Sequence, residues 1–211
     1  MRLIKYTHAC VRLESDSGVL VIDPGGFSER EALTGADAVL VTHEHMDHLL
    51  VDAVVDEHAQ RPGLRVFTHA EVAPKLDAIA SAVTAVAPGD AFEAAGFRVR
   101  AFGGIHAEIH ADIPRVANLG YLVDELVYHP GDSLHVPEDT TVDTLLAPIS
   151  GPWLKSGEVI NFLRAVAPRQ ALAIHEKLVS DTGLGLVDNL FSNLGRTDYH
   201  RLTSGEAITV G

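Results

Sequence analysis

Hydrophobic residues along the chain form short runs, and polar residues typical of tight turns separate these runs. Near the N-terminus, three such runs predict a meander of strands around 2–6, 10–15 and 18–23. The next run, "DAVLVT", is apolar at most positions, which is typical of a strand covered on both faces. "LLVDAVVDEHA" follows with helical spacing of its apolar residues. The residues between these last two runs are therefore expected to form a loop that leads from a buried strand into a helix.

Strand-like and helix-like runs alternate through the rest of the chain, and no solenoid repeat or low-complexity segment interrupts them. "LGYLVDE" and "LVYHPGD" are adjacent and predict a hairpin. The whole pattern predicts a mixed α/β (α+β) chain. Its other expected elements are the strand "LRVFT", the helix "AEVAPKLDAIA", short strands near 83–86, 91–94 and 97–102, the strand "TLLAPI", the helix "GEVINFLRAVA", the strand "QALAIH", a helix near 184–194 and the strand "AITVG".

Two distant segments share one unusual pattern. "VLVIDPGG" and "LVYHPGDS" each end an apolar strand in a polar residue followed by Pro-Gly. Two similar halves, each a strand layer with helices outside, would bring such strand ends to one shared edge. Polar groups from both halves are then expected to meet there.

The composition is that of an ordinary globular protein. The chain has 211 residues, of which 46% are hydrophobic and 21% charged, so one domain spanning 1–211 is expected. Its formal net charge of −13 repels phosphate backbones. Nucleic-acid and anionic-membrane partners are therefore not expected, whereas an oligomer is compatible with the sequence.

The cysteine count and the N-terminus both indicate a cytoplasmic protein. Cys10 is the only cysteine, so no internal disulfide can form, which fits a reducing compartment. "MRLIKYTHACVRLE" lacks the apolar core and cleavage site of a signal peptide. No segment approaches the roughly 20 apolar residues of a membrane span.

Three histidines and one aspartate fall within the six positions "HEHMDH", directly after the buried strand. Burying them as bare polar groups would be costly, and a divalent metal would satisfy them. On an irregular loop, His43 and His45 can converge on one ion while Asp47 and His48 turn toward another. Imidazole and carboxylate ligands suit zinc, manganese or iron. The alternative is a polar turn in which the aspartate caps the following helix and the histidines are solvated.

Further ligands are expected just past later apolar strands. "YHPGDS" supplies Asp132 and "ALAIHEK" supplies His175. "AFGGIHAEIH" supplies either His106 or His110, and the sequence leaves this choice open. The other histidines are expected to be solvated or hydrogen-bonded structural residues: His58, His69, His129, His135 and His200.

Taken together, these motifs resemble the metallo-β-lactamase superfamily, whose signature is H-x-H-x-D-H followed by a distant histidine, an aspartate and a final histidine. The resemblance spans nearly the whole chain and implies the four-layer αβ/βα sandwich, with the site at one edge of two sheets. "TLLAPISG" is similar to its counterpart in the subgroup of small hydrolases that includes ascorbate-phosphate lactonase. By this resemblance two divalent metal ions are held by His43, His45 and His106 on one side and Asp47, His48 and His175 on the other, with Asp132 bridging.

The resemblance also implies roles near the metals. Asp23, at the end of "VLVID", would orient a ligand histidine. His8, in "YTHAC", is similar to a histidine in the first turn of some small members; it either faces the pocket or is an exposed turn residue. Trp153 is expected to be either a core anchor or a wall of the cleft.

The implied activity is that of a metal-dependent hydrolase. A hydroxide held by the metals would attack a small-molecule lactone, ester or phosphodiester, with Asp47 and Asp132 as catalytic residues. An anionic substrate is compatible if the metals hold its charge. Two alternatives stay open: a nuclease or phosphodiesterase acting on nucleotides, and a non-catalytic metal-binding domain.

Overall fold

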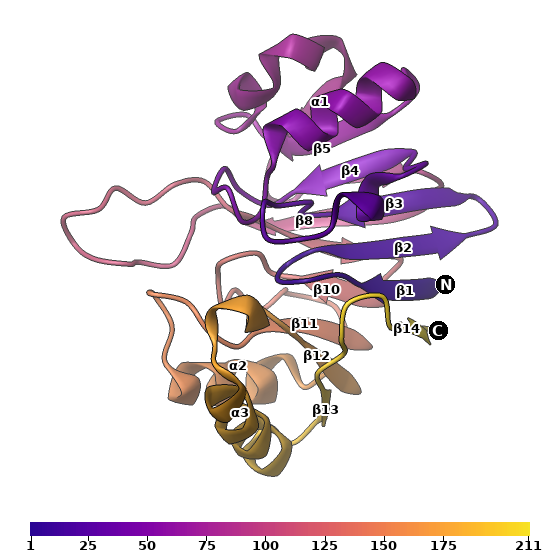
Figure 1. The fold of residues 1–211 in the computed structure, drawn as a ribbon. Coiled ribbons are helices and arrows are strands. Elements are labelled where there is room, and N and C mark those ends of the chain that lie inside the picture. Colours follow the sequence, from indigo (N-terminus) through magenta and orange to yellow (C-terminus); the bar gives the residue numbers. More distant parts are fainter.

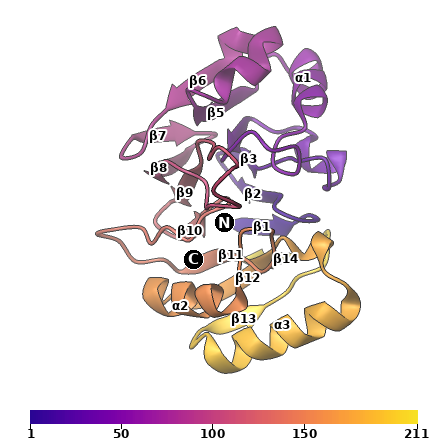
Figure 2. The same ribbon diagram turned by 90° about the vertical axis from the view of Figure 1, so that its left-hand side faces the viewer.

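The computed structural model describes all 211 residues and places the strands in two seven-stranded sheets that pack face to face (Figure 1). Helices cover the outer face of each sheet, which gives four layers in the order helix, sheet, sheet, helix (Figure 2). The predicted αβ/βα sandwich is therefore confirmed. No helix combines the length and the apolar character needed to cross a membrane.

The first sheet contains the N-terminal strands and the C-terminal one. It is antiparallel from β14 to β3 and parallel from β3 to β6. In spatial order its strands are β14 (Ala207–Thr209), β1 (Arg2–Lys5), β2 (Val11–Ser15), β3 (Gly18–Ile22), β4 (Ala38–Val41), β5 (Arg65–His69) and β6 (Val83–Val86).

The second sheet repeats this plan. It is antiparallel from β7 to β10 and parallel from β10 to β13, and the predicted hairpin is formed by β9 and β10. In spatial order its strands are β13 (Asp198–His200), β12 (Gln170–Ile174), β11 (Thr144–Pro148), β10 (Val127–His129), β9 (Leu119–Val123), β8 (Phe97–Gly103) and β7 (Ala91–Ala94).

The shared pattern "polar residue, Pro, Gly" has a structural counterpart in both sheets. It follows β3 in the first sheet and begins at the end of β10 in the second, and each of these strands is where antiparallel pairing changes to parallel. The two segments meet across the sheets, where His129 Nε2 lies 3.7 Å from Asp23 Oδ2. The expected shared edge is therefore present, and the polar strand ends gather there.

Successive side chains of a strand point to opposite faces of the sheet, and this alternation explains the layers. In β4, Ala38 and Leu40 belong to the core between the sheets, whereas Val39 and Val41 pack under the helices of the first sheet. β4 is buried on both faces, as its apolar run predicts. The first sheet is covered by η1 (Arg30–Leu33), α1 (Val51–Gln60) and η2 (Ala73–Ala82), and the second by α2 (Ser156–Val166) and α3 (Asp181–Leu194).

η2 and β13 differ from the sequence-based expectation for reasons that the structure makes clear. The helix expected in "AEVAPKLDAIA" is a run of 3₁₀ turns, η2, with non-helical backbone at Leu76 and Ile79. Its buried residues are Leu76, Ile79 and Ala82, a spacing of three that matches the three residues per turn of a 3₁₀ helix. β13 was not predicted, because this three-residue strand has exposed residues on either side of one buried tyrosine and so lacks an apolar run.

Candidate metal centre

The loop between β4 and α1 holds the three histidines and the aspartate of "HEHMDH" against the Pro-Gly turn after β3. Gly26 N–H donates to the Met46 carbonyl at 2.7 Å. A Cβ at Gly25 would lie 1.8 Å from the Asp47 carbonyl oxygen, so only glycine allows this approach. His43 and His48 are buried, while His45 and Asp47 are half-buried and lie toward solvent.

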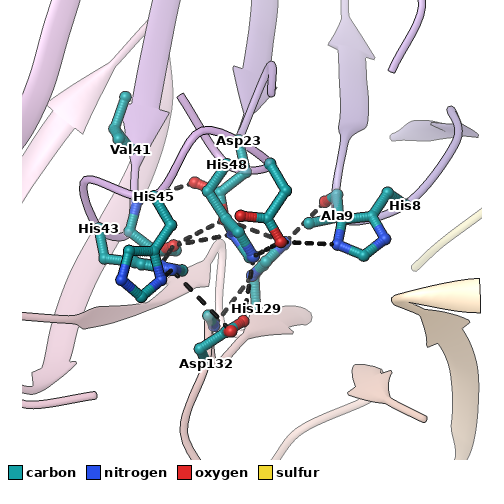
Figure 3. A network of polar contacts seen from close by, with 12 residues as sticks. His8, Ala9, Asp23, Val41, His43, His45, His48, His129 and Asp132 are labelled. Carbon is teal, nitrogen blue, oxygen red and sulfur yellow. Dashed lines mark hydrogen bonds and ion pairs between the residues drawn. The ribbon is translucent and has the colours of Figure 1, made fainter. Parts of the chain in front are cut away.

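Two groups of side chains converge at the shared edge of the sheets. Figure 3 shows His43, His45 and Asp132 from one group and His8 and His48 from the other. Within each group, the potential ligand atoms all lie within 4.8 Å of one another. The first group is His43, His45, His106 and Asp132, and the second is His8, His48 and His175.

Asp132 contacts both groups with different oxygens. Its Oδ2 lies 3.2 Å from His106 Nε2 and 4.0 Å from His43 Nε2. Its Oδ1 lies 3.0 Å from His48 Nε2 and 2.9 Å from His175 Nε2. The carboxylate therefore stands between the groups, where the resemblance implies a bridging ligand.

The Nδ1 atoms of four histidines are held by protein acceptors. His48 Nδ1 lies 2.6 Å from Asp23 Oδ2, and His43 Nδ1 lies 3.0 Å from Thr42 Oγ1. His106 Nδ1 lies 2.6 Å from the Ala107 carbonyl, and His175 Nδ1 lies 3.0 Å from the Ser150 carbonyl. Each Nδ1 must carry the proton to donate to these oxygens, so each Nε2 presents a lone pair to the centre.

Asp23 organises this arrangement from underneath. It is fully buried and accepts the Thr42 N–H at 2.8 Å and the Thr42 hydroxyl at 2.7 Å, in addition to its contact with His48. Because the Thr42 hydroxyl donates to Asp23, its oxygen is free to accept from His43 Nδ1. Asp23 thus lies where the resemblance implies, against a candidate ligand histidine.

The donor set fits a bound cation. His48 Nε2 and His175 Nε2 lie 3.0 Å apart, and Asp132 Oδ1 lies within 3.0 Å of both, so two imidazole nitrogens and a carboxylate oxygen converge on one point. Asp132 Oδ1 and His106 Nε2 are buried and make no hydrogen bond. Ligands about 2.0–2.2 Å from one divalent ion lie about 3–3.5 Å from each other, which is close to these distances.

The pKa directions show the same demand for positive charge. Burial alone would lower the pKa of His48, but the carboxylates of Asp132 and Asp23 raise it well above its usual value. Burial opposes ionisation of Asp132, yet the adjacent His175 and His48 hold its pKa well below the usual range. Burial, together with the neighbouring His48, keeps the pKa of His43 well below the usual histidine value. A cation at this point would therefore be stabilised electrostatically.

Asp47 lies beside the second group and contacts two of its members, His48 and His8. Asp47 Oδ2 is 3.9 Å from His48 Nε2 and 3.0 Å from His8 Nε2. Although burial opposes it, the hydrogen bond from His8 lowers the pKa of Asp47 to about 2. His8 is fully buried and stacks on His175, with ring centroids 4.3 Å apart. Of the two alternatives for His8, the structure places it at the site and not in an exposed turn.

Lys5 and Glu176 fix the backbone of His8, a link that the sequence did not indicate. Lys5 Nζ is buried, donates to the His8 carbonyl at 2.8 Å and lies 3.1 Å from Glu176 Oε1. The same Glu176 oxygen accepts the His8 N–H at 2.7 Å. Both His8 and His175 have left-handed backbone, with φ of 68° and 69°, and this ion pair joins the two turns.

The choice between His106 and His110 is decided by the segment between β8 and β9, which projects from the body (Figure 1). His106 lies at its base, where its N–H donates to the Val116 carbonyl at 3.0 Å and its ring enters the first group. The side chain of His110 is 65% exposed and faces Asp112. His110 therefore lies outside the centre.

Trp153 lies within the centre. It is buried, and its Nε1 donates to Asp132 Oδ2 at 2.9 Å. His129, by contrast, has the structural role expected of it, because its Nε2 donates to the Ala9 carbonyl at 2.8 Å.

Comparison with known proteins gives a consistent result. A family model described as a β-lactamase superfamily domain matches residues 2–175. Protein Rv0786c of Mycobacterium tuberculosis is 35% identical over 99% of this chain and 100% of its own length. A UPF0173 protein of Pyrococcus furiosus is 32% identical over 83% of each chain. A UPF0173 metal-dependent hydrolase of Thermoplasma acidophilum is 24% identical over 83% of each chain.

The fold also has counterparts among solved structures. Igni18, described as a metallo hydrolase from Ignicoccus hospitalis, matches with a TM-score of 0.77 at 20% identity. The match covers 98% of this chain and 97% of that one. This likeness supports the four-layer architecture over the whole chain.

Proposed function

The chain belongs to the metallo-β-lactamase superfamily and to its UPF0173 family, and on that premise we propose that it is a metal-dependent hydrolase of a small-molecule ester, lactone or phosphodiester. One observation carries the proposal: the carboxylate of Asp132 presents one oxygen to each of two histidine groups. A shared carboxylate between imidazole clusters suits two adjacent divalent ions. A relative within the UPF0173 family is described as a metal-dependent hydrolase.

Seven side chains would hold the ions. We assign His43, His45 and His106 to the first ion, Asp47, His48 and His175 to the second, and Asp132 to both. Zinc or manganese suits this nitrogen and oxygen set, and iron is compatible with it. When bound, such ions polarise the group under attack and favour ionisation of water at neutral pH.

Asp47 is the residue best placed to orient the attacking water. It lies toward solvent, with a side chain that is 21% exposed, at the open side of the second group. A pKa of about 2 keeps it ionised throughout the neutral range, so it is a hydrogen-bond acceptor and a poor proton store. We therefore assign Asp47 to binding the second ion and orienting the water, and Asp132 to linking the two ions.

The test compares initial rates on a generic phosphodiester and on a panel of sugar and acyl-homoserine lactones, with chelator-stripped protein and added zinc or manganese. We expect metal to restore turnover, and we expect Asp132→Ala to abolish it. Asp112→Ala is the matched control, because that side chain is 91% exposed and lies outside the centre. A preference for the phosphodiester would narrow the proposed substrate class to phosphodiesters, and only faster cleavage of nucleotides than of the generic phosphodiester would favour the nuclease alternative. Metal binding without turnover of any substrate would favour a non-catalytic domain.

A further inference from the structure

The only tryptophan of the chain is joined to the shared carboxylate of the candidate metal centre. Trp153 follows β11, and its side chain is 8% exposed. Its indole N–H donates to Asp132 Oδ2 at 2.9 Å. The ring centroid lies 6.0 Å from that of His106 and 6.4 Å from that of His175, so the indole packs edge-to-face against one histidine of each group.

The local chain is shaped to place the indole there. A Cβ at Gly151 would lie 2.8 Å from Trp153 Nε1, so a larger residue at 151 would displace the ring. Leu154 N–H closes a turn by donating to the Gly151 carbonyl at 3.1 Å. Ser150, at the start of the turn, donates its hydroxyl to the His175 carbonyl at 2.6 Å. The turn is thus tied to His175 at one end and to Asp132 at the other.

Outside the candidate ligands, the indole is the one group that donates a hydrogen bond to the Asp132 carboxylate. The backbone N–H of Asp132 donates to Asn118 Oδ1, which fixes its main chain. The hydrogen bond from the indole opposes rotation of the carboxylate about its last bond. A free carboxylate can turn both oxygens toward one ion, whereas a carboxylate held through Oδ2 keeps one oxygen for each.

We propose that Trp153 is a positioning residue that holds Asp132 in the bridging orientation, and that it thereby sets the affinity for the second ion to bind. This inference rests on the two-ion site of the proposed function. Its chemistry is a single hydrogen bond from a buried indole to a carboxylate ligand, and such supporting contacts change metal affinity by about 10–100-fold. Loss of the N–H should weaken the second binding step by that factor and leave the first step nearly unchanged.

The experiment is a stepwise zinc titration of the stripped full chain, in which calorimetry and native mass spectrometry measure each binding step. Because the chain has one tryptophan, replacing it biosynthetically with the benzothienyl analogue exchanges only the indole N–H for sulfur at this position. Trp153→Phe removes the N–H and also part of the ring. In the wild type, the fluorescence of this single indole should respond to zinc, and thermal unfolding checks that each variant is folded.

We expect the analogue and Trp153→Phe to weaken the second step alike. A weaker second step in Trp153→Phe with a normal one in the analogue would assign the effect to packing and overturn the proposal. A normal second step in both would also overturn it while leaving the two-ion site intact. Failure of the wild type to bind a second ion would instead refute the two-ion assignment itself.

Discussion

Replacement of Asp23 by asparagine removes one negative charge from beneath the candidate metal centre without changing the shape of the side chain. Asp23 has left-handed backbone, with φ of 52°, which asparagine tolerates better than alanine does. The substitution therefore separates the charge from backbone strain. Asp16→Asn is the matched control, because Asp16 lies exposed in the turn between β2 and β3.

The expected loss follows from the three hydrogen bonds that Asp23 accepts. Two come from Thr42 and one comes from His48 Nδ1, all within 2.8 Å. Hydrogen bonds to a charged group contribute about 1.5–3 kcal/mol each, against about 0.5–1.5 for neutral ones. Losing about 1 kcal/mol from each of three bonds lowers the free energy of unfolding by about 3 kcal/mol.

Metal binding should suffer for a different reason. The asparagine amide presents N–H groups to His48 Nδ1, which moves the imidazole proton to Nε2, the atom that faces Asp132. Binding an ion must then displace that proton, so we expect the metal affinity to fall by about 10–100-fold. Urea unfolding and zinc titration of stripped Asp23→Asn measure the two effects. Wild-type stability and wild-type zinc affinity in this variant would show that the Asp23 charge supports neither the fold nor His48.

Three further predictions concern protonation and packing. The stripped protein should be most stable near pH 6.5. Below that pH, burial keeps the pKa values of His43 and His45 lowered in the folded state, so unfolding takes up protons and stability falls by about 1–3 kcal/mol per pH unit. Above it, the raised pKa of His48 means that the stabilisation contributed by its protonated form is lost as the pH rises. A curve of unfolding free energy against pH without this maximum would contradict the lowered pKa values of His43 and His45 and the raised pKa of His48. Burial raises the pKa of Cys10 to about 12, so a thiol reagent at pH 8 should react with the unfolded chain only, and rapid native labelling would show the thiol to be accessible. Gly25→Ala should cost the chain both its zinc affinity and several degrees of thermal stability, because the added methyl overlaps the loop backbone; an unchanged melting temperature and zinc affinity would disprove the steric argument.

Much of the fold could be predicted because its signals are local. Buried strands such as β4 and β12 appear as continuous apolar runs, and the polar residues that follow them stand out. The repeated Pro-Gly pattern after β3 and β10 correctly indicated two halves with a shared edge. η2 was predicted as an ordinary helix, and only the structure shows that its buried residues follow the three-residue spacing of 3₁₀ turns. β13 was missed because its single buried tyrosine forms no apolar run.

The candidate site divides in the same way. The order of His43, His48, Asp132 and His175 along the chain was readable from the motif, and the structure brings these side chains together. The position of Trp153 against Asp132 depends on a turn between β11 and α2 that has no recognised motif.

Pairings between distant residues were also beyond the reach of the sequence. The pairing of Lys5 with Glu176 joins residues 171 positions apart, and no local pattern encodes it. His106 and His110 lie four residues apart on one projecting segment, so spacing alone could not tell the buried base from the exposed tip.

Native mass spectrometry counts the ions bound by the chelator-stripped chain during titration with zinc or manganese. We expect two ions per wild-type chain at saturation. We also expect Asp132→Ala to lose the two-ion state, because the shared carboxylate serves both groups. A wild-type chain that saturates with one ion or none, or an Asp132→Ala chain that still binds two, would contradict the two-ion site.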